Sequence, residues 1–155
     1  MDREPSRGRA VVMQLGDGPS YWQPVPANGH ADPKLFPGNT GFAGLSMGFQ
    51  TIAPKSRIRE HSHGDQIELQ ICFRGRGWVV VDGVSHPLLN EGPDELVMLW
   101  LVSPLGLEDF FKAIGRPRTP GEPAPAPFAR PENVVATERA MGMNDTRAWL
   151  APPER

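Results

Sequence analysis

The residues best suited to chemistry lie between His61 and Glu68. His61 and His63 are two positions apart, and side chains two apart on an extended strand point to the same face. Glu68 comes five positions after His63, which is the wrong parity for an unbroken strand. Gly64 and Asp65 supply a turn that can bring the carboxylate back to that face. Two imidazoles and one carboxylate form a ligand set for a transition metal, with positions left open for a substrate.

Further side chains could contact a substrate beside such a metal. Gln70 lies two residues after Glu68, so on a strand it shares the face of Glu68 and is a candidate substrate or ligand contact. The large apolar side chains Trp78, Met98 and Trp100 are candidates for the wall of a substrate pocket. Packing in the hydrophobic core is the alternative role for these three residues.

A simpler interpretation of the histidines is a polar strand edge. In that case His61 and His63 face solvent, and Glu68 pairs with Arg57 or Arg59. The flanking sequence favours the metal site over this alternative, because strands are predicted on both sides of the candidate ligands.

The elements that must position these residues are predicted to be mainly strands. Eighteen prolines and seventeen glycines suit a β-rich fold with many turns. Asp82 and Gly83 form a strong two-residue hairpin signal. The runs that favour strands are Val11–Leu15, Phe42–Ile52, Trp78–Val81, Val84–Leu88 and Leu96–Val102.

The last third of the chain favours helices joined by a proline-rich connector. Residues 104–115 have early acids, apolar residues at helical spacing and a closing glycine. Residues 116–131 contain six prolines, which predicts a stiff, extended strap, and residues 131–142 favour a second helix. We therefore expect three parts: a flexible leader over 1–10, a main domain over 11–115, and the strap with a C-terminal helix over 116–155.

The centre of the chain resembles the first motif of the cupin superfamily. In that motif His-x-His is followed after three or four residues by a glutamate and after six more by a glycine. His61, His63, Glu68 and Gly75 have this spacing, and Lys55 stands where the motif has its opening glycine. The resemblance implies an all-β fold over 11–115, a cupin-like β-barrel or jelly roll that can be incomplete, with one or two C-terminal helices.

The second cupin motif, which supplies a further histidine ligand, is shortened in this chain. It runs glycine, five residues, Pro-x-Gly, two residues, histidine, three residues and asparagine. Asn90 stands where the closing asparagine would be, but too few residues separate it from Gly83 when Gly83 is taken as the first glycine. We interpret this as an internal deletion of about two short strands. His86 is interpreted as a turn histidine rather than the lost ligand, so a weakened metal site is expected.

The resemblance implies a function for the metal site. The predicted metal site is similar to that of mononuclear non-haem iron dioxygenases, which act on small organic substrates, including aromatic ones. Iron(II) is the metal expected first, with manganese, nickel and zinc as alternatives. A metal-dependent isomerase or lyase, a non-catalytic small-molecule binder and a scaffold protein are the other functions that the resemblance leaves open. Small cupins commonly pair through their sheets, so a homodimer is expected.

Composition excludes several other classes. The net charge of −2 over 155 residues argues against a general nucleic-acid binder. The chain has no long apolar run and no signal-peptide core, so a cytoplasmic protein without a membrane partner is expected.

Cys72 is the single cysteine and is predicted to be a small buried hydrophobe. His30 has no partner nearby in the sequence and is expected to be a polar surface residue.

Overall fold

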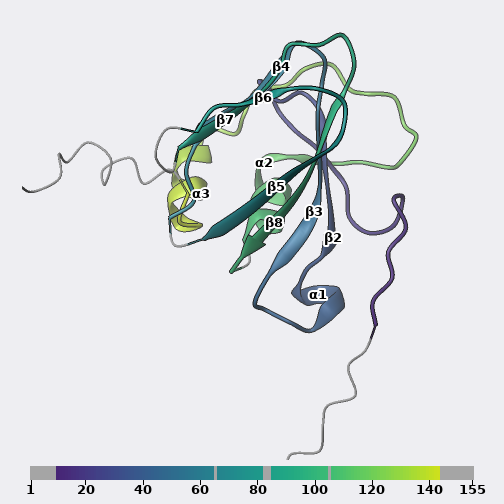
Figure 1. Cartoon of the computed structure of the whole chain (residues 1–155), viewed down its shortest axis with the longest axis vertical. Coiled ribbons are helices and arrows are strands. Elements are labelled where there is room, and N and C mark those ends of the chain that lie inside the picture. The colour runs from purple at the N-terminus through teal and green to yellow at the C-terminus, as the bar shows by residue number, and fades with distance from the viewer. Residues whose placement is uncertain (1–9, 65, 82–84, 105, 144–155) are drawn as a thin grey trace, which may run out of the picture.

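The computed structural model of this protein describes residues 10–64, 66–81, 85–104 and 106–143. Most of this part of the chain is β-structure, with a few short helices (Figure 1). In chain order the elements are β1 (Tyr21–Trp22), β2 (His30–Leu35), α1 (Pro37–Thr40), β3 (Ser46–Ile52), β4 (Ser56–His61), β5 (Ile67–Arg74), β6 (Trp78–Val79), β7 (His86–Asn90), β8 (Leu96–Ser103), α2 (Leu107–Ile114), β9 (Arg116–Pro117) and α3 (Val134–Ala140).

The strands form two antiparallel sheets. The larger sheet has the order β5-β8-β3-β2-β1-β9, and the smaller sheet has the order β4-β7-β6. The two sheets share no strand, so they are not closed into a barrel. The expectation of a mostly-β fold with C-terminal helices is confirmed, and the two sheets are open rather than closed into a barrel.

The centre of the larger sheet is a close pairing of β3 with its neighbours. Gly48 on β3 faces Trp100 on β8 and Pro33 on β2. A Cβ atom on Gly48 would lie 2.7 Å from the Trp100 ring and 2.8 Å from the Pro33 Cα. Only glycine therefore lets the fully buried Trp100 side chain lie across β3.

Two hydrophobic clusters cover the inner face of the larger sheet. One lies between the sheets and consists of Ile52, Leu88, Leu96 and Met98, with Ile58 packed against them. The other joins the larger sheet to α2 and consists of Ala31, Trp100, Val102, Leu107, Phe111 and Met143. The inner face is thus covered by the smaller sheet in one place and by α2 in another.

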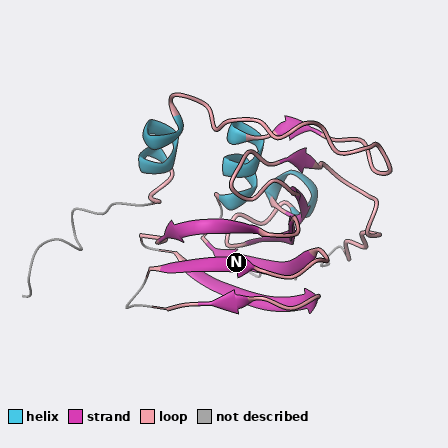
Figure 2. Ribbon diagram, turned by 90° about the horizontal axis from the view of Figure 1, so that it is seen from above, coloured by secondary structure: helices cyan, strands magenta, loops and turns pink. Residues whose placement is uncertain are grey.

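Helix α2 forms as the sequence predicts. Glu108 lies in its first turn and accepts a hydrogen bond from the Gly106 N–H, which satisfies a backbone donor at the helix N-terminus. Leu107, Phe111 and Ile114 form its buried face. In Figure 2 α2 and α3 lie side by side, to one side of the long strands. None of the helices in the described ranges is long and apolar enough to cross a membrane.

The proline-rich strap runs back over the first strands. β9 pairs with β1, the Val25 N–H donates to the Phe128 carbonyl at 2.9 Å, and the Trp22 indole N–H donates to Glu122 at 2.6 Å. The chain then enters α3, which lies inside the range predicted for the second helix. The strap is therefore extended as expected, whereas the part of the leader over residues 1–9 lies outside the described residues.

Some of the sequence predictions for strands are wrong. The run Val11–Leu15 forms no strand, and Val12 and Leu15 are exposed. The strand β2 was not predicted because it contains Pro33, which sheets tolerate at irregularities. The β2–β3 register indeed shifts between Pro33 and Leu35. The run Trp78–Val81 is a strand only over its first two residues.

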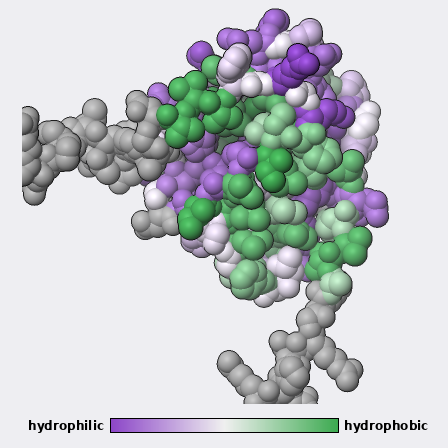
Figure 3. All heavy atoms as spheres, in the orientation of Figure 1, coloured by the Kyte–Doolittle hydropathy of each residue, from purple (hydrophilic) through white to green (hydrophobic). Residues whose placement is uncertain are grey.

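The outer face of β5 is apolar and exposed. Ile67 is 75% exposed, and Leu69, Ile71 and Phe73 are each about half exposed. Apolar side chains gather over the region where Figure 1 places β5, β8 and β3 (Figure 3). Because β5 is an edge strand, this surface adjoins unpaired backbone groups. The prediction that Cys72 is buried is wrong, since this edge strand leaves it exposed.

Candidate metal centre

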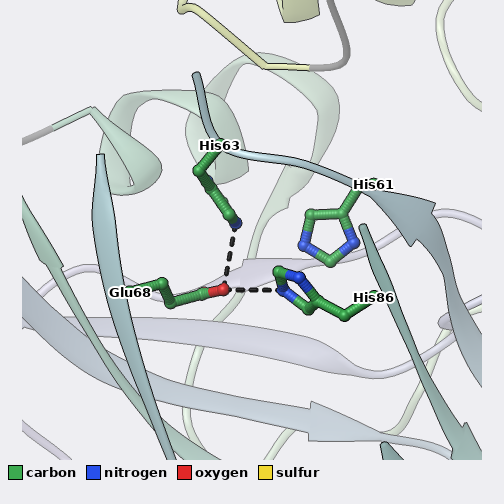
Figure 4. A group of neighbouring side chains, drawn as sticks. All are labelled: His61, His63, Glu68 and His86. Atoms are coloured by element: carbon green, nitrogen blue, oxygen red, sulfur yellow. Dashed lines mark hydrogen bonds and ion pairs between the residues drawn. The ribbon is translucent and has the colours of Figure 1, made fainter. Parts of the chain in front are cut away.

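Four side chains converge between the two sheets (Figure 4). His61 ends β4, Glu68 lies in β5, His86 begins β7, and His63 lies in the connection between β4 and β5. One ligand atom from each residue lies within 4.8 Å of the ligand atoms of the other three. The group contains three of the four histidines in the chain.

Strand pairing places the ligands together. His61 and His86 are direct partners in the β4–β7 ladder, after a register shift that follows Ile58. Glu68 comes from the edge of the other sheet, so the cluster joins the two sheets. His63 is fixed from the C-terminal side, where it pairs with Met143 in an isolated antiparallel bridge. Met143 is buried, so the turn after α3 covers this side of the cluster.

Hydrogen bonds hold the imidazole rings with their Nε2 atoms free to act as ligands. The Nδ1–H of His61 donates to the Arg59 carbonyl at 2.9 Å, and the Nδ1–H of His63 donates to Gln66 Oε1 at 3.2 Å. Such an outer hydrogen bond fixes the tautomer and orientation of a metal-binding histidine. His61 and His63 are therefore prepared for ligation in the way that metal sites require.

Glu68 is the anionic centre of the group. Its Oε2 lies 2.8 Å from His86 Nε2 and 3.1 Å from His63 Nε2, and its Oε1 accepts a hydrogen bond from Gln70 at 2.7 Å. Burial alone would raise the pKa of Glu68, but the contacts with His63 and His86 outweigh it and hold the pKa well below its usual range. Glu68 is therefore ionised at neutral pH.

His61 is neutral in this environment. Burial, together with the neighbouring His63 and His86, lowers the pKa of His61 to about 4. A neutral imidazole keeps the lone pair that a metal ligand needs. At neutral pH the group thus offers one neutral nitrogen from His61 and one negative oxygen from Glu68.

The residues fit a divalent transition metal. His63 Nε2 is buried and has no hydrogen-bond partner among the described residues, because its contact with Glu68 lacks hydrogen-bonding geometry. A buried polar atom without a partner is destabilising, and a metal ion would satisfy it. Metal–ligand bonds of ~2.1 Å would place the ligand atoms within ~4.2 Å of one another. The cluster would need to contract by only about half an ångström.

The interpretation of His86 as a turn histidine is wrong. Its side chain is only 14% exposed and contacts Glu68. The sequence did contain the signal: three residues separate His86 from Asn90, which is the spacing of the histidine and asparagine in the second cupin motif. Gly83 then matches the second glycine of that motif and Gly75 its first glycine, with Val81 in place of the proline. No residue is therefore missing between Gly75 and Asn90, and the interpretation of an internal deletion in this motif is wrong. A weakened metal site was expected because a fourth ligand was missing. His86 lies where it can act as that ligand, so this reason no longer applies.

Asn90 and Lys55 also fit the motif positions. The buried Asn90 amide donates to the carbonyls of Ile52, Ala53 and Asp94, which ties the end of β7 to β3 and to the turn before β8. Lys55 has a φ of 59°, the left-handed conformation that glycine adopts most easily. This chain therefore places a lysine in a backbone conformation that favours glycine.

A pocket adjoins the metal ligands. It is open to solvent. His61, Glu68 and Gln70 line it, and the apolar face of α2 contributes Leu107, Phe110 and Phe111 to its wall. Such a site accommodates a small organic molecule.

Gln70 lines this pocket, as the sequence suggested, but the three apolar candidates do not. Trp78 is 64% exposed on the smaller sheet. Met98 and Trp100 are buried in the two hydrophobic clusters. Their alternative role in packing therefore applies, and the wall is built instead from α2. The periodicity of α2 predicted a helix but did not show which pocket its apolar face would line.

Comparisons with known proteins give a loose likeness of fold. No protein-family model matches the chain, and no curated protein does. A crystal structure of an uncharacterised conserved protein with a double-stranded β-helix domain, from Klebsiella pneumoniae, is 13% identical. It matches with a TM-score of 0.47 over 62% of this chain and 91% of that chain. A protein from Acidithiobacillus ferrooxidans, provisionally named a sugar phosphate isomerase, is 16% identical. It matches with a TM-score of 0.41 over 60% of this chain and 73% of that chain.

Proposed function

We propose that this protein is a cupin-type metalloenzyme that acts on a small organic substrate. One divalent transition metal would be held by His61, His63, Glu68 and His86. The observation that carries the proposal is the convergence of four ligand atoms, drawn from both sheets, beside a pocket. A buried cluster of three histidines and one glutamate destabilises the fold unless its polar atoms have hydrogen-bond or metal partners. Its presence between the sheets is therefore best explained by a function.

The ligand set indicates which metals fit. Three imidazoles and one carboxylate suit iron(II), and also manganese, nickel and zinc. A six-coordinate ion would keep two positions for exchangeable groups. The bound ion would supply Lewis-acid activation and, as iron(II), access to dioxygen chemistry. Iron(II) is the metal we propose first.

The chain's own residues would bind and orient the substrate. Gln70 donates its amide hydrogen to Glu68, and its Oε1 is buried without a hydrogen-bond partner among the described residues. That oxygen can accept a hydrogen bond from a substrate O–H or N–H next to the metal ligands. The aromatic wall from Phe110 and Phe111 would exclude water on the opposite side.

The pocket favours oxidative chemistry over proton transfer. An isomerase or lyase needs a side chain that can carry a proton to or from the substrate. Among the described residues that line the pocket, His61 and Glu68 are metal ligands, and Glu138 is paired with two arginines. The other polar groups are glutamines and arginines. We propose a dioxygenase-type reaction, which does not depend on a protein base, ahead of a metal-dependent isomerase or lyase, in which a metal-bound hydroxide would have to carry the proton.

Metal-dependent turnover tests this proposal. Purified protein would be stripped with a chelator, loaded separately with iron(II), manganese(II), nickel(II) or zinc(II), and incubated with a library of small organic compounds. Oxygen uptake and product mass would be measured together. We expect uptake with the iron(II) form and none with His63→Ala, whereas His30→Gln, which changes the histidine outside the cluster, should behave like the wild type.

Other outcomes would decide against the proposed reaction. A product formed without oxygen uptake would indicate an isomerase or lyase. Binding of metal and compounds without any product would indicate a non-catalytic binding protein. Failure to retain any of the four metals would contradict the metal site itself.

A further inference from the structure

The pocket beside the metal ligands has a cationic side. Arg57, Arg59 and Arg130 all line it. Arg57 and Arg59 come from β4, four and two residues before His61, and Arg130 comes from the end of the proline-rich strap. Segments that are distant in the sequence thus bring three arginine residues to one pocket.

These arginines outnumber the carboxylates that face them. Arg59 pairs with Glu138 Oε1 at 2.8 Å, and Arg130 pairs with the same oxygen. Arg57 makes no ion pair with any residue in the described part of the chain. Glu68 is engaged with the histidines, so Glu138 is the one pocket carboxylate available to three guanidinium groups among the described lining residues. The pocket therefore attracts an anion.

Glu138 shows what kind of anion suits the arginines. Its side chain, from α3, is only 6% exposed, whereas the side chains of Arg59 and Arg130 are 45% and 18% exposed. Guanidinium groups match the planar geometry of a carboxylate, and such charge-assisted pairs are stronger than neutral hydrogen bonds. The chain's own carboxylate thus occupies an arginine pair that could equally hold the carboxylate of a ligand.

We propose that the pocket binds a small organic carboxylate, with Arg57 and Arg59 as its anchors and Glu138 as an internal competitor. The apolar part of the ligand would lie against Phe110 and Phe111 of α2. This names the substrate class for the proposed metal-dependent function and rests on it. Binding of the carboxylate itself depends on the arginines, so it can be measured in metal-free protein.

A fluorine NMR titration with metal-free protein tests the proposal. The probes are 4-fluorophenylacetate, its uncharged amide, and 4-fluorophenyl phosphate, which measure the contributions of charge and of carboxylate geometry. A charge-assisted hydrogen bond at a half-exposed site contributes about tenfold in affinity. We expect the acid to bind at least about tenfold more tightly than the amide, and more tightly than the phosphate.

Variants identify the groups responsible. Arg57→Gln should weaken acid binding about tenfold, while Glu138→Gln should strengthen it by a similar factor because it releases Arg59 and Arg130. Arg74→Gln is the matched control, because Arg74 is 66% exposed, pairs with Glu95 and does not line the pocket. Circular dichroism melts would establish that each variant is folded.

Several results would overturn this inference. Equal affinities for acid and amide, or equal effects of Arg57→Gln and Arg74→Gln, would exclude arginine anchoring of a carboxylate. Tighter binding of the phosphate would replace the carboxylate with a phosphate ligand. Weaker acid binding by folded Glu138→Gln protein would show that Glu138 builds the site instead of competing for it. If metal binds the histidine cluster but the acid binds no more tightly than the amide, this inference alone is refuted. If the acid binds but no turnover is detected, only the proposed reaction is refuted.

Discussion

Replacing His86 with alanine should weaken metal binding by about 100-fold. The loss of an outer hydrogen-bonding partner typically lowers metal affinity 10–100-fold, and His86 is proposed as a ligand in direct contact with the ion. Its side chain is 14% exposed, so water can enter and replace part of the lost coordination. The effect should therefore stay near the upper end of that range, about 100-fold, without abolishing binding.

The same reasoning predicts an order among the histidines. His63 is 3% exposed, so water replaces it less well, and His63→Ala should weaken binding more than His86→Ala does. His30 lies in β2, where it contacts Asp32 and Thr51, so His30→Gln should leave the affinity unchanged. Zinc affinity would be measured by competition with a chromophoric chelator, which avoids oxidation of iron. A His86→Ala affinity within threefold of the His30→Gln affinity would refute the assignment of His86.

Three further predictions concern the anion, the outer network and the exposed sheet. Glu68→Ala should weaken zinc binding far more than Gln70→Ala, because Glu68 alone brings a compensating charge; equal affinities in the chelator competition would rule out Glu68 as a ligand. Burial raises the pKa of Asp32, but hydrogen bonds with His30 and Ser20 outweigh it and leave the pKa lowered. Asp32 should thus stabilise the fold above its unfolded pKa of about 3.9 and lose this contribution as the pH falls through its folded pKa. The melting-temperature gap between wild type and Asp32→Asn should then be larger at pH 7 than at pH 3, and a gap that grows on acidification would contradict this. Finally, we propose that the expected homodimer forms through the outer face of β5, so Leu69→Asp should shift the sedimentation mass from two chains to one; a wild-type mass of one chain at all concentrations would exclude it.

Local sequence features predicted the parts of the site that depend on neighbouring residues. The His-x-His spacing and the turn at Gly64 and Asp65 indicated that His61, His63 and Glu68 belong together, and the structure brings them into one cluster. The early acids and closing glycine of α2 likewise signalled a helix. These features follow from strand alternation and helix capping, which act over a few residues.

Long-range pairing decided the rest. His86 joins the cluster because β7 pairs with β4 at His61. The spacing of His86 and Asn90 signalled this ligand, but the strand register that brings it to His61 is not specified by neighbouring residues. The pairing of Arg59 with Glu138 joins residues 79 positions apart, so no local pattern could indicate it. Residue type alone left Met98 and Trp100 with two candidate roles, in a pocket wall or in the core, because the side of a sheet that faces a pocket depends on the packing of the other layers. The absent strand over Val11–Leu15 has the same cause, since a strand needs a partner, whereas β2 was not predicted because it contains Pro33.

An anomalous-diffraction experiment on crystals of metal-loaded protein would test the central claim most directly. Crystals of zinc-loaded or manganese-loaded protein would be measured on both sides of the metal absorption edge. We predict one anomalous peak per chain, bonded to Nε2 of His61, His63 and His86 and to a carboxylate oxygen of Glu68. A peak elsewhere, or a metal-loaded crystal in which these four residues keep their present contacts with no peak between them, would contradict the account.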